Sequence, residues 1–170
     1  MIIKLLGAVC VILGCGAFGY MIAFNARKEM STLRQLINVL EFFECELSYR
    51  MLPLAQLCRL AAAIASSNMQ RLLICIAEEL ERQRAHNVEK CIIYAIHNCP
   101  EIPPLTAQRV IELGKTLGKF DLGGQIKCIR GINAENKRLL DQISVDHIIR
   151  FRSYKTLGLC AGAALVILFI

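Results

Sequence analysis

The stretch of sequence that decides the fold is residues 33–47, which reads LRQLINVLEFFECEL. Its apolar residues recur at spacings of three and four, the period of an α-helix that buries one face. These residues are Leu33, Leu36, Ile37, Leu40, Phe43 and Leu47. No run of alternating Val, Ile or Thr elsewhere indicates a strand. We therefore predict an all-α fold, in which this helix is continuous with the apolar run before it.

Four shorter helical patterns follow. Pro53 predicts a break and then the first turn of a new helix, and a second break falls at residues 66–68. Glu78 and Arg82 have the i,i+4 spacing of an ion pair on a helix. Asn87 is a good N-cap for the fourth helix. The apolar positions of these helices are Leu54, Leu57, Ala61, Leu72, Leu73, Ile76, Leu80, Val88, Ile92, Ala95, Ile96, Val110, Leu113 and Leu117.

A last long helix is expected after Asp121, which should act as its N-cap. Its apolar stripe consists of Ile126, Ile129, Ile132, Leu139, Leu140 and Ile143. Gly123, Gly124 and Gly131 weaken this helix by about 1 kcal/mol each relative to alanine.

Two apolar runs predict membrane spans. Residues 5–24 carry no charge, and at about 1.5 Å per residue they span about 30 Å, the thickness of the hydrocarbon core. Residues 156–170 span only about 22 Å, and residues 151–155 can make up the difference at the interface. Lys and Arg flank both runs on the side of the middle segment, so the positive-inside rule predicts that the middle is cytoplasmic.

The predicted organisation is a two-pass protein of the bacterial cell membrane. Residues 1–27 form an N-terminal transmembrane segment, 28–153 a cytoplasmic helical domain and 154–170 a C-terminal transmembrane segment. The expected architecture is a membrane-anchored helical bundle. A long N-terminal and a long C-terminal helix continue into the membrane, with short helical hairpins between them.

Composition narrows the function. The formal net charge is +6, but Lys and Arg are interspersed with Glu, Trp is absent and only 6% of residues are aromatic. This pattern argues against a surface that stacks nucleic-acid bases. The nine cysteines contain no C-x-x-C pair, which suits buried thiols in a reducing compartment better than a disulfide framework.

Two patterns imitate chemical sites. Gly114-Lys115-Thr116 resembles the end of a phosphate-binding loop, but Arg109 occupies the position of the required first glycine. Cys91, His97 and Cys99 could suggest zinc, but no further ligand has a recognisable spacing. We therefore expect no catalytic residue, no cofactor and no metal, and a protein that is not an enzyme.

The first helix carries an acidic cluster, Glu41, Glu44 and Glu46. This cluster could be a solvated face, a surface that docks a partner, or a site of acid–base chemistry. We take docking as the functional hypothesis. The candidate docking residues are Glu41, Glu44, Glu46, Tyr49, Asp121 and Gln125.

The order of these features resembles the stage III sporulation protein AB family. The resemblance rests on the glycine-rich first span, on residues 40–49 (LEFFECELSY) before Pro53, on residues 117–121 (LGKFD), and on residues 154–158 (YKTLG). The glycines at 123 and 124 depart from the polar helix formers expected there. The resemblance implies an endospore-forming bacterium, the mother-cell membrane, and a channel between mother cell and forespore. It also implies a likeness to the platform protein, the F component, of type II secretion systems.

The function we expect is therefore a non-enzymatic inner-membrane platform. Its implied partners are a secretion-like ATPase (the sporulation AA protein), other subunits of the channel complex and membrane lipid, with no nucleic acid and no small-molecule substrate. The alternative is a membrane-tethered scaffold or lipoprotein unrelated to sporulation, because residues 12–15 (ILGC) resemble a lipobox ending at Cys15.

Overall fold

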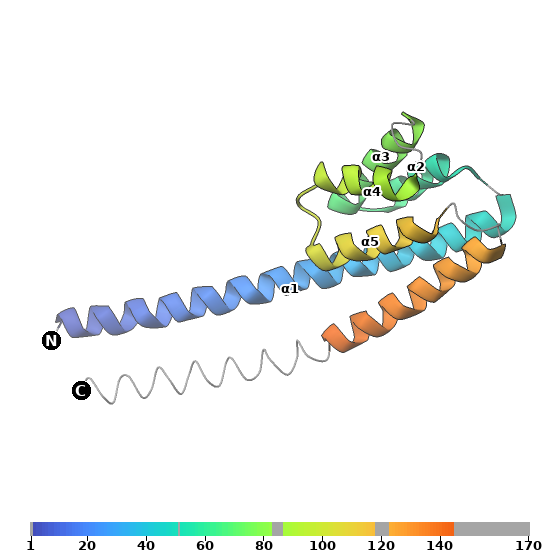
Figure 1. Cartoon of the computed structure of the whole chain (residues 1–170). Helices are drawn as coiled ribbons and strands as arrows, with labels where there is room; N and C mark the ends of the chain where they lie inside the picture. The colour runs from blue at the N-terminus through green and yellow to red at the C-terminus, as the bar shows by residue number, and fades with distance from the viewer. Residues whose placement is uncertain (1, 51, 83–86, 118–122, 145–170) are drawn as a thin grey trace. The chain divides into compact units, whose positions relative to one another are not determined.

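The computed structural model describes residues 2–50, 52–82, 87–117 and 123–144, and the side chains of the first helix only at Phe24 and from Arg27 onward (Figure 1). The helices are α1 (Ile2–Arg50), α2 (Leu54–Ile64), α3 (Ser67–Glu81), α4 (Val88–His97) and α5 (Pro104–Thr116). A further helix, here named the last helix, covers 123–144. The described residues contain no strand, which confirms the prediction of an all-α fold.

The chain divides into two compact units. The central unit is Glu29–Leu140, and the other unit combines Met1–Lys28 with Asp141–Ile170. The predicted continuity of the first helix is confirmed, since α1 runs from Ile2 to Arg50. Among the described residues, no helix combines the length and the apolar character that a membrane span requires. The predicted second span lies outside the described residues, and both spans and the domain boundaries stay predictions.

The helix starts follow from local sequence. Pro53 and Pro103 stand immediately before α2 and α5, and Pro104 occupies the first turn of α5, where its missing N–H costs no helical hydrogen bond. The predicted cap at Asn87 is confirmed, because its side chain accepts a 3.2 Å hydrogen bond from the Glu89 backbone N–H. The predicted break at residues 66–68 lies slightly earlier in the structure: α2 ends at Ile64, and Ser67 and Asn68 already belong to α3.

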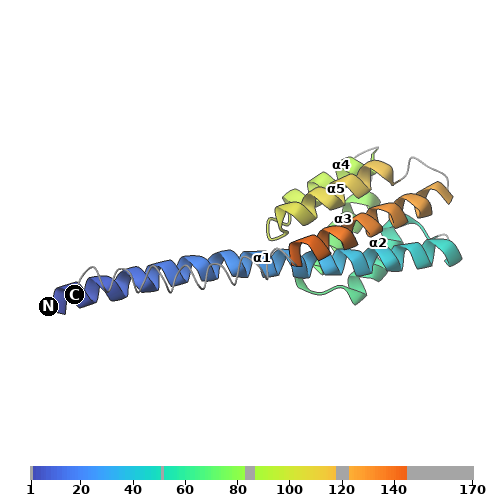
Figure 2. The same cartoon turned by 90° about the horizontal axis from the view of Figure 1, so that it is seen from below.

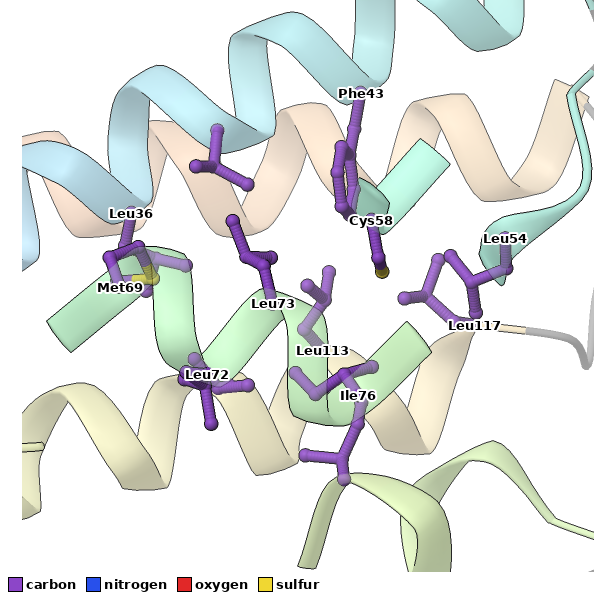
Figure 3. A pocket seen from close by; sticks show the side chains of 13 residues that line it. Leu36, Phe43, Leu54, Cys58, Met69, Leu72, Leu73, Ile76, Leu113 and Leu117 are labelled. Carbon is purple, nitrogen blue, oxygen red and sulfur yellow. The ribbon is translucent and has the colours of Figure 1, made fainter. Parts of the chain in front are cut away.

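The core of the central unit forms around α1. All six apolar residues of the predicted stripe on α1 are buried, and each such side chain contributes about 1.5–3 kcal/mol of hydrophobic stabilisation. Helices α1 to α5 all contribute to a small apolar cavity of about 20 Å³ (Figure 3). Its lining includes Leu36, Cys58, Leu72, Ile92 and Leu113, one residue from each of these helices in turn. The cavity lies in the interior packing and is too small for a substrate.

The last helix lies beside α1 within the central unit and runs in the opposite direction (Figures 1 and 2). Its predicted stripe is confirmed in part. Ile129 and Ile132 are buried, whereas Ile126, Leu139, Leu140 and Ile143 are half-buried. Two asparagines, Asn133 and Asn136, complete the buried face. A count of apolar positions alone does not identify them.

Candidate interaction surface

Two of the predicted docking residues bind the last helix. The Arg130 guanidinium donates to Glu44 Oε1 from Nε at 2.9 Å and from Nη2 at 2.7 Å. One helical turn earlier on α1, Glu41 Oε1 lies 2.7 Å from Lys137 Nζ. Each of these acids therefore holds a cation of the neighbouring helix, while Glu41 stays about half-exposed.

Glu46 lies on the other side of α1. At about 100° per residue it is about 140° around the helix from Glu41, and its side chain is only 19% exposed. Its Oε2 is buried without a hydrogen bond and lies 3.7 Å from Arg50 Nε. That separation exceeds hydrogen-bond distance. Glu46 therefore does not share a surface with Glu41 and Glu44.

Tyr49 is the most exposed of the large hydrophobic residues whose exposure is described, at 83%. It ends an exposed row on α1 that we name the outer stripe. The outer stripe consists of Arg34, Asn38, Glu41, Cys45, Ser48 and Tyr49. Successive members from Arg34 to Ser48 are three or four residues apart, and Tyr49 is four residues after Cys45, so all six lie on one face of the helix. The Ser48 hydroxyl donates a 2.7 Å hydrogen bond to the Glu44 backbone carbonyl, which fixes that side chain against the helix.

The two remaining docking candidates belong to the C-terminal part of the central unit. Asp121 lies outside the described residues. Gln125 is half-buried in the first turn of the last helix. It is five residues before Arg130, as Tyr49 is five residues after Glu44, so the antiparallel register places Gln125 about level with Tyr49. The structure thus brings Glu41 and Glu44 to the side of α1 that meets the last helix. Tyr49 and Gln125 share an axial level only, and Glu46 lies apart.

The motif that imitates a phosphate-binding loop lies at the end of a helix. Gly114, Lys115 and Thr116 are the last three residues of α5. The Thr116 hydroxyl donates to the Leu113 carbonyl at 2.8 Å. Gly114 is buried, and its hydrogen faces α4, where an added Cβ would lie 2.7 Å from Ile92 Cδ1. The glycine therefore serves close packing of two helices.

The thiols and the histidine considered for zinc do not converge. Cys91 Sγ lies 3.7 Å from the Glu79 carbonyl, Cys99 Sγ lies 3.7 Å from Cys75 Sγ, and His97 is exposed. No group of three potential metal ligands occurs among the described residues. Burial raises the pKa of Cys58 to about 12 and that of Cys99 to about 11, which keeps both thiols protonated and unreactive at neutral pH.

The Arg59–Glu81 ion pair has an exposure similar to that of the Glu41–Lys137 pair, so it can serve as a reference for it. Arg59 on α2 donates to both carboxylate oxygens of Glu81 on α3, at 2.7 and 2.6 Å. This hydrogen bonding lowers the pKa of the Glu81 carboxyl and raises that of Arg59. Both side chains of each pair are about half-exposed. The two pairs therefore have similar solvent screening but lie on different helices.

Sequence reasoning missed the cations that hold the acids. Arg130 and Lys137 are seven residues apart, which is two helical turns, so they share a face of the last helix. The last helix also pairs with α5: Arg109 Nη1 lies 3.1 Å from Glu135 Oε1. The spacing of these charges was visible in the sequence. Their pairing depends on which helices are neighbours.

Comparisons with known proteins agree with the fold. No curated protein matches the chain significantly. A solved structure described as stage III sporulation protein AB superimposes with a TM-score of 0.63 at 16% sequence identity, covering 71% of this chain and 97% of that one. At this identity the likeness concerns the fold. Residues 4–170 match the sequence model of the family described as stage III sporulation protein AB. The resemblance is thereby confirmed: the chain belongs to the stage III sporulation protein AB family, and its role is related to sporulation.

Proposed function

We propose that this protein is a non-enzymatic membrane platform of a sporulation channel complex, and that the outer stripe of α1 docks a cytosolic partner. The observation that carries the proposal is Tyr49, an aromatic side chain 83% exposed at the end of the row that contains Glu41. Tyrosine is enriched among the residues that contribute most to protein–protein binding. An exposed tyrosine beside charged groups therefore suits the centre of a polar contact of modest size.

The proposed partner is the secretion-like ATPase that the family resemblance implies, with other channel subunits as further partners. The protein would act from the mother-cell membrane through two transmembrane segments, with residues 28–153 cytoplasmic. Energy for assembly or transport would come from the ATPase. Glu41 would contribute chiefly to the rate and orientation of association, because its exposed charge is screened by salt.

The test is binding of the purified full-length chain to the purified ATPase at low and high salt, measured by surface plasmon resonance. Tyr49→Ala should raise the Kd at least tenfold. Tyr94→Ala is the matched control, since Tyr94 is another exposed tyrosine, 57% exposed on α4, and it should leave the Kd unchanged.

A second pair of variants tests the charge. Glu41→Lys should slow association at low salt and have less effect at high salt. Glu81→Lys breaks the reference pair with Arg59 and should leave association unchanged. If the folded chain does not bind the ATPase at either salt concentration, the platform role for this partner is wrong. If the Tyr94 and Tyr49 variants lose binding equally, the outer stripe is not the docking surface.

A further inference from the structure

The buried face of the last helix is unusually polar. Asn136 is 0% exposed and Asn133 is also buried. Among the residues that the structure describes, neither Nδ2 nor Oδ1 of Asn136 has a hydrogen-bond partner, and Asn133 Oδ1 has none either. Buried amides normally have such partners, because removing them from water without replacement is costly. Two residues of this helix therefore oppose the packing that Ile129 and Ile132 favour.

The facing helix repeats the pattern. Thr106 of α5 is fully buried, and its hydroxyl also has no hydrogen-bond partner. The Arg109–Glu135 ion pair fixes the register between α5 and the last helix. Thr106 is one turn before Arg109 and Asn136 follows Glu135. Because the two helices run in opposite directions (Figure 1), Thr106 and Asn136 lie within about 3 Å of each other along the helix axes.

Three ion pairs also join the last helix to its neighbours, and at least one side chain of each pair is more than half exposed. Arg130 pairs with Glu44, Lys137 with Glu41, and Glu135 with Arg109. Exposed pairs of this kind contribute little stability and are weakened by salt.

We propose that the last helix is a releasable clasp, which detaches from the rest of the central unit while α1 to α5 remain folded. Lifting the helix costs the burial of Ile129 and Ile132 and the partial burial of Ile126, Leu139, Leu140 and Ile143. It also lets water reach the unpartnered polar atoms of Thr106, Asn133 and Asn136, which recovers hydrogen bonds that the closed state lacks. The open state frees Glu41 and Glu44 from their cations. This inference does not depend on the identity of any partner.

Hydrogen–deuterium exchange of the full-length chain, read by mass spectrometry, tests the proposal. Amides of 123–140 should be protected at least 100-fold less than those of residues 33–47 in α1. Molar salt should raise exchange in 123–140 by several-fold and leave 33–47 unchanged. Equal protection of the two segments would overturn the proposal.

Two substitutions test the cause. Asn136→Leu replaces the buried amide by an apolar side chain of similar size, and Thr106→Val removes the facing hydroxyl. Each should raise protection of 123–140 about tenfold. Asn38→Leu is the control for the general preference of leucine in helices, since Asn38 is exposed on α1, and it should not change exchange in 123–140. If Asn136→Leu fails to fold, Thr106→Val still decides. Unchanged exchange in Thr106→Val would show that the buried Thr106 hydroxyl does not loosen the helix.

Discussion

Gly114 tests whether α4 and α5 are held together by close approach of their backbones. A Cβ at position 114 would lie 2.7 Å from Ile92 Cδ1 and 3.3 Å from the Glu89 Cα. The first contact can be relieved by a rotation of the Ile92 side chain. The second is with the backbone of the first turn of α4, so relief requires the helices to separate. Overpacking of this kind costs about 1–3 kcal/mol.

Alanine is also a better helix former than glycine by about 1 kcal/mol, and this gain opposes the steric cost. Gly114→Ala should therefore lower the free energy of unfolding by about 1 kcal/mol overall. Gly131→Ala is the matched control, because nothing lies within 4 Å of the added Cβ. It should raise the free energy of unfolding by about 1 kcal/mol. The two substitutions are chemically identical and are expected to have opposite signs.

Urea unfolding of the full-length chain followed by far-ultraviolet circular dichroism measures both changes. Adding Ile92→Val to Gly114→Ala removes the Cδ1 atom nearest the new Cβ, so the double variant should lose less than the sum of the single losses. If Gly114→Ala stabilises the protein as much as Gly131→Ala does, the close approach of α5 to α4 is not as the structure has it.

Three further predictions concern individual groups. The unfolding free energy should fall as pH rises from 9.0 towards about 12, because the pKa of the Cys58 thiol is 9.0 in the unfolded chain and about 12 when buried. A Cys58→Ala variant should lose less stability over this range, by roughly 2 kcal/mol near pH 10.5. An unchanged slope in that variant would contradict the burial of this thiol. Alkylation at neutral pH followed by peptide mapping should modify exposed Cys45 at least 100 times faster than buried Cys58. Equal rates would show that Cys58 of α2 is not buried in the core. Ser67 has a φ of 50°, a conformation that costs a non-glycine residue about 1 kcal/mol. Ser67→Gly should therefore raise the free energy of unfolding by about that amount. A lower stability of the variant in thermal or urea unfolding would show that the strain is absent.

The features that sequence predicted are those fixed by near neighbours in the chain. The buried stripe of α1 follows from spacings of three and four, and the start of α4 follows from a cap at Asn87 that reaches only two residues ahead. The start of α2 after Pro53 is equally local. Such features depend on periodicity and backbone chemistry, which a single sequence displays directly.

The features that sequence missed depend on contacts between distant segments. Glu44 and Arg130 are 86 positions apart, so nothing local indicates that the acid is already occupied. Gly114 resembles a phosphate-binding glycine until its contact with Glu89 and Ile92 is seen. Asn133 and Asn136 contradict the rule that buried helix faces are apolar, and no propensity identifies such an exception. These two buried asparagines are the basis of the proposed release of the last helix.

The proposed docking surface and the proposed clasp share one residue, Glu41, which lies on the outer stripe and also holds Lys137. A partner that offers its own cation to Glu41 competes with Lys137 and so favours the open clasp. Thermodynamic linkage then requires that closing the clasp weakens partner binding by the same factor by which the bound partner opens the clasp. Asn136→Leu, which should close the clasp about tenfold more tightly, should weaken partner binding by up to the same factor.

Both sides of this coupling can be measured with the same proteins. Bound partner should increase deuterium exchange in 123–140, and the Kd of Asn136→Leu should rise. Gln70→Leu, at an exposed position of α3 away from the outer stripe, should change neither quantity. An unchanged Kd in a well-folded Asn136→Leu variant, with exchange in 123–140 slowed as expected, would mean that the partner binds the outer stripe without displacing Lys137. In that case the clasp and the docking surface act independently, and Tyr49 rather than Glu41 carries the contact.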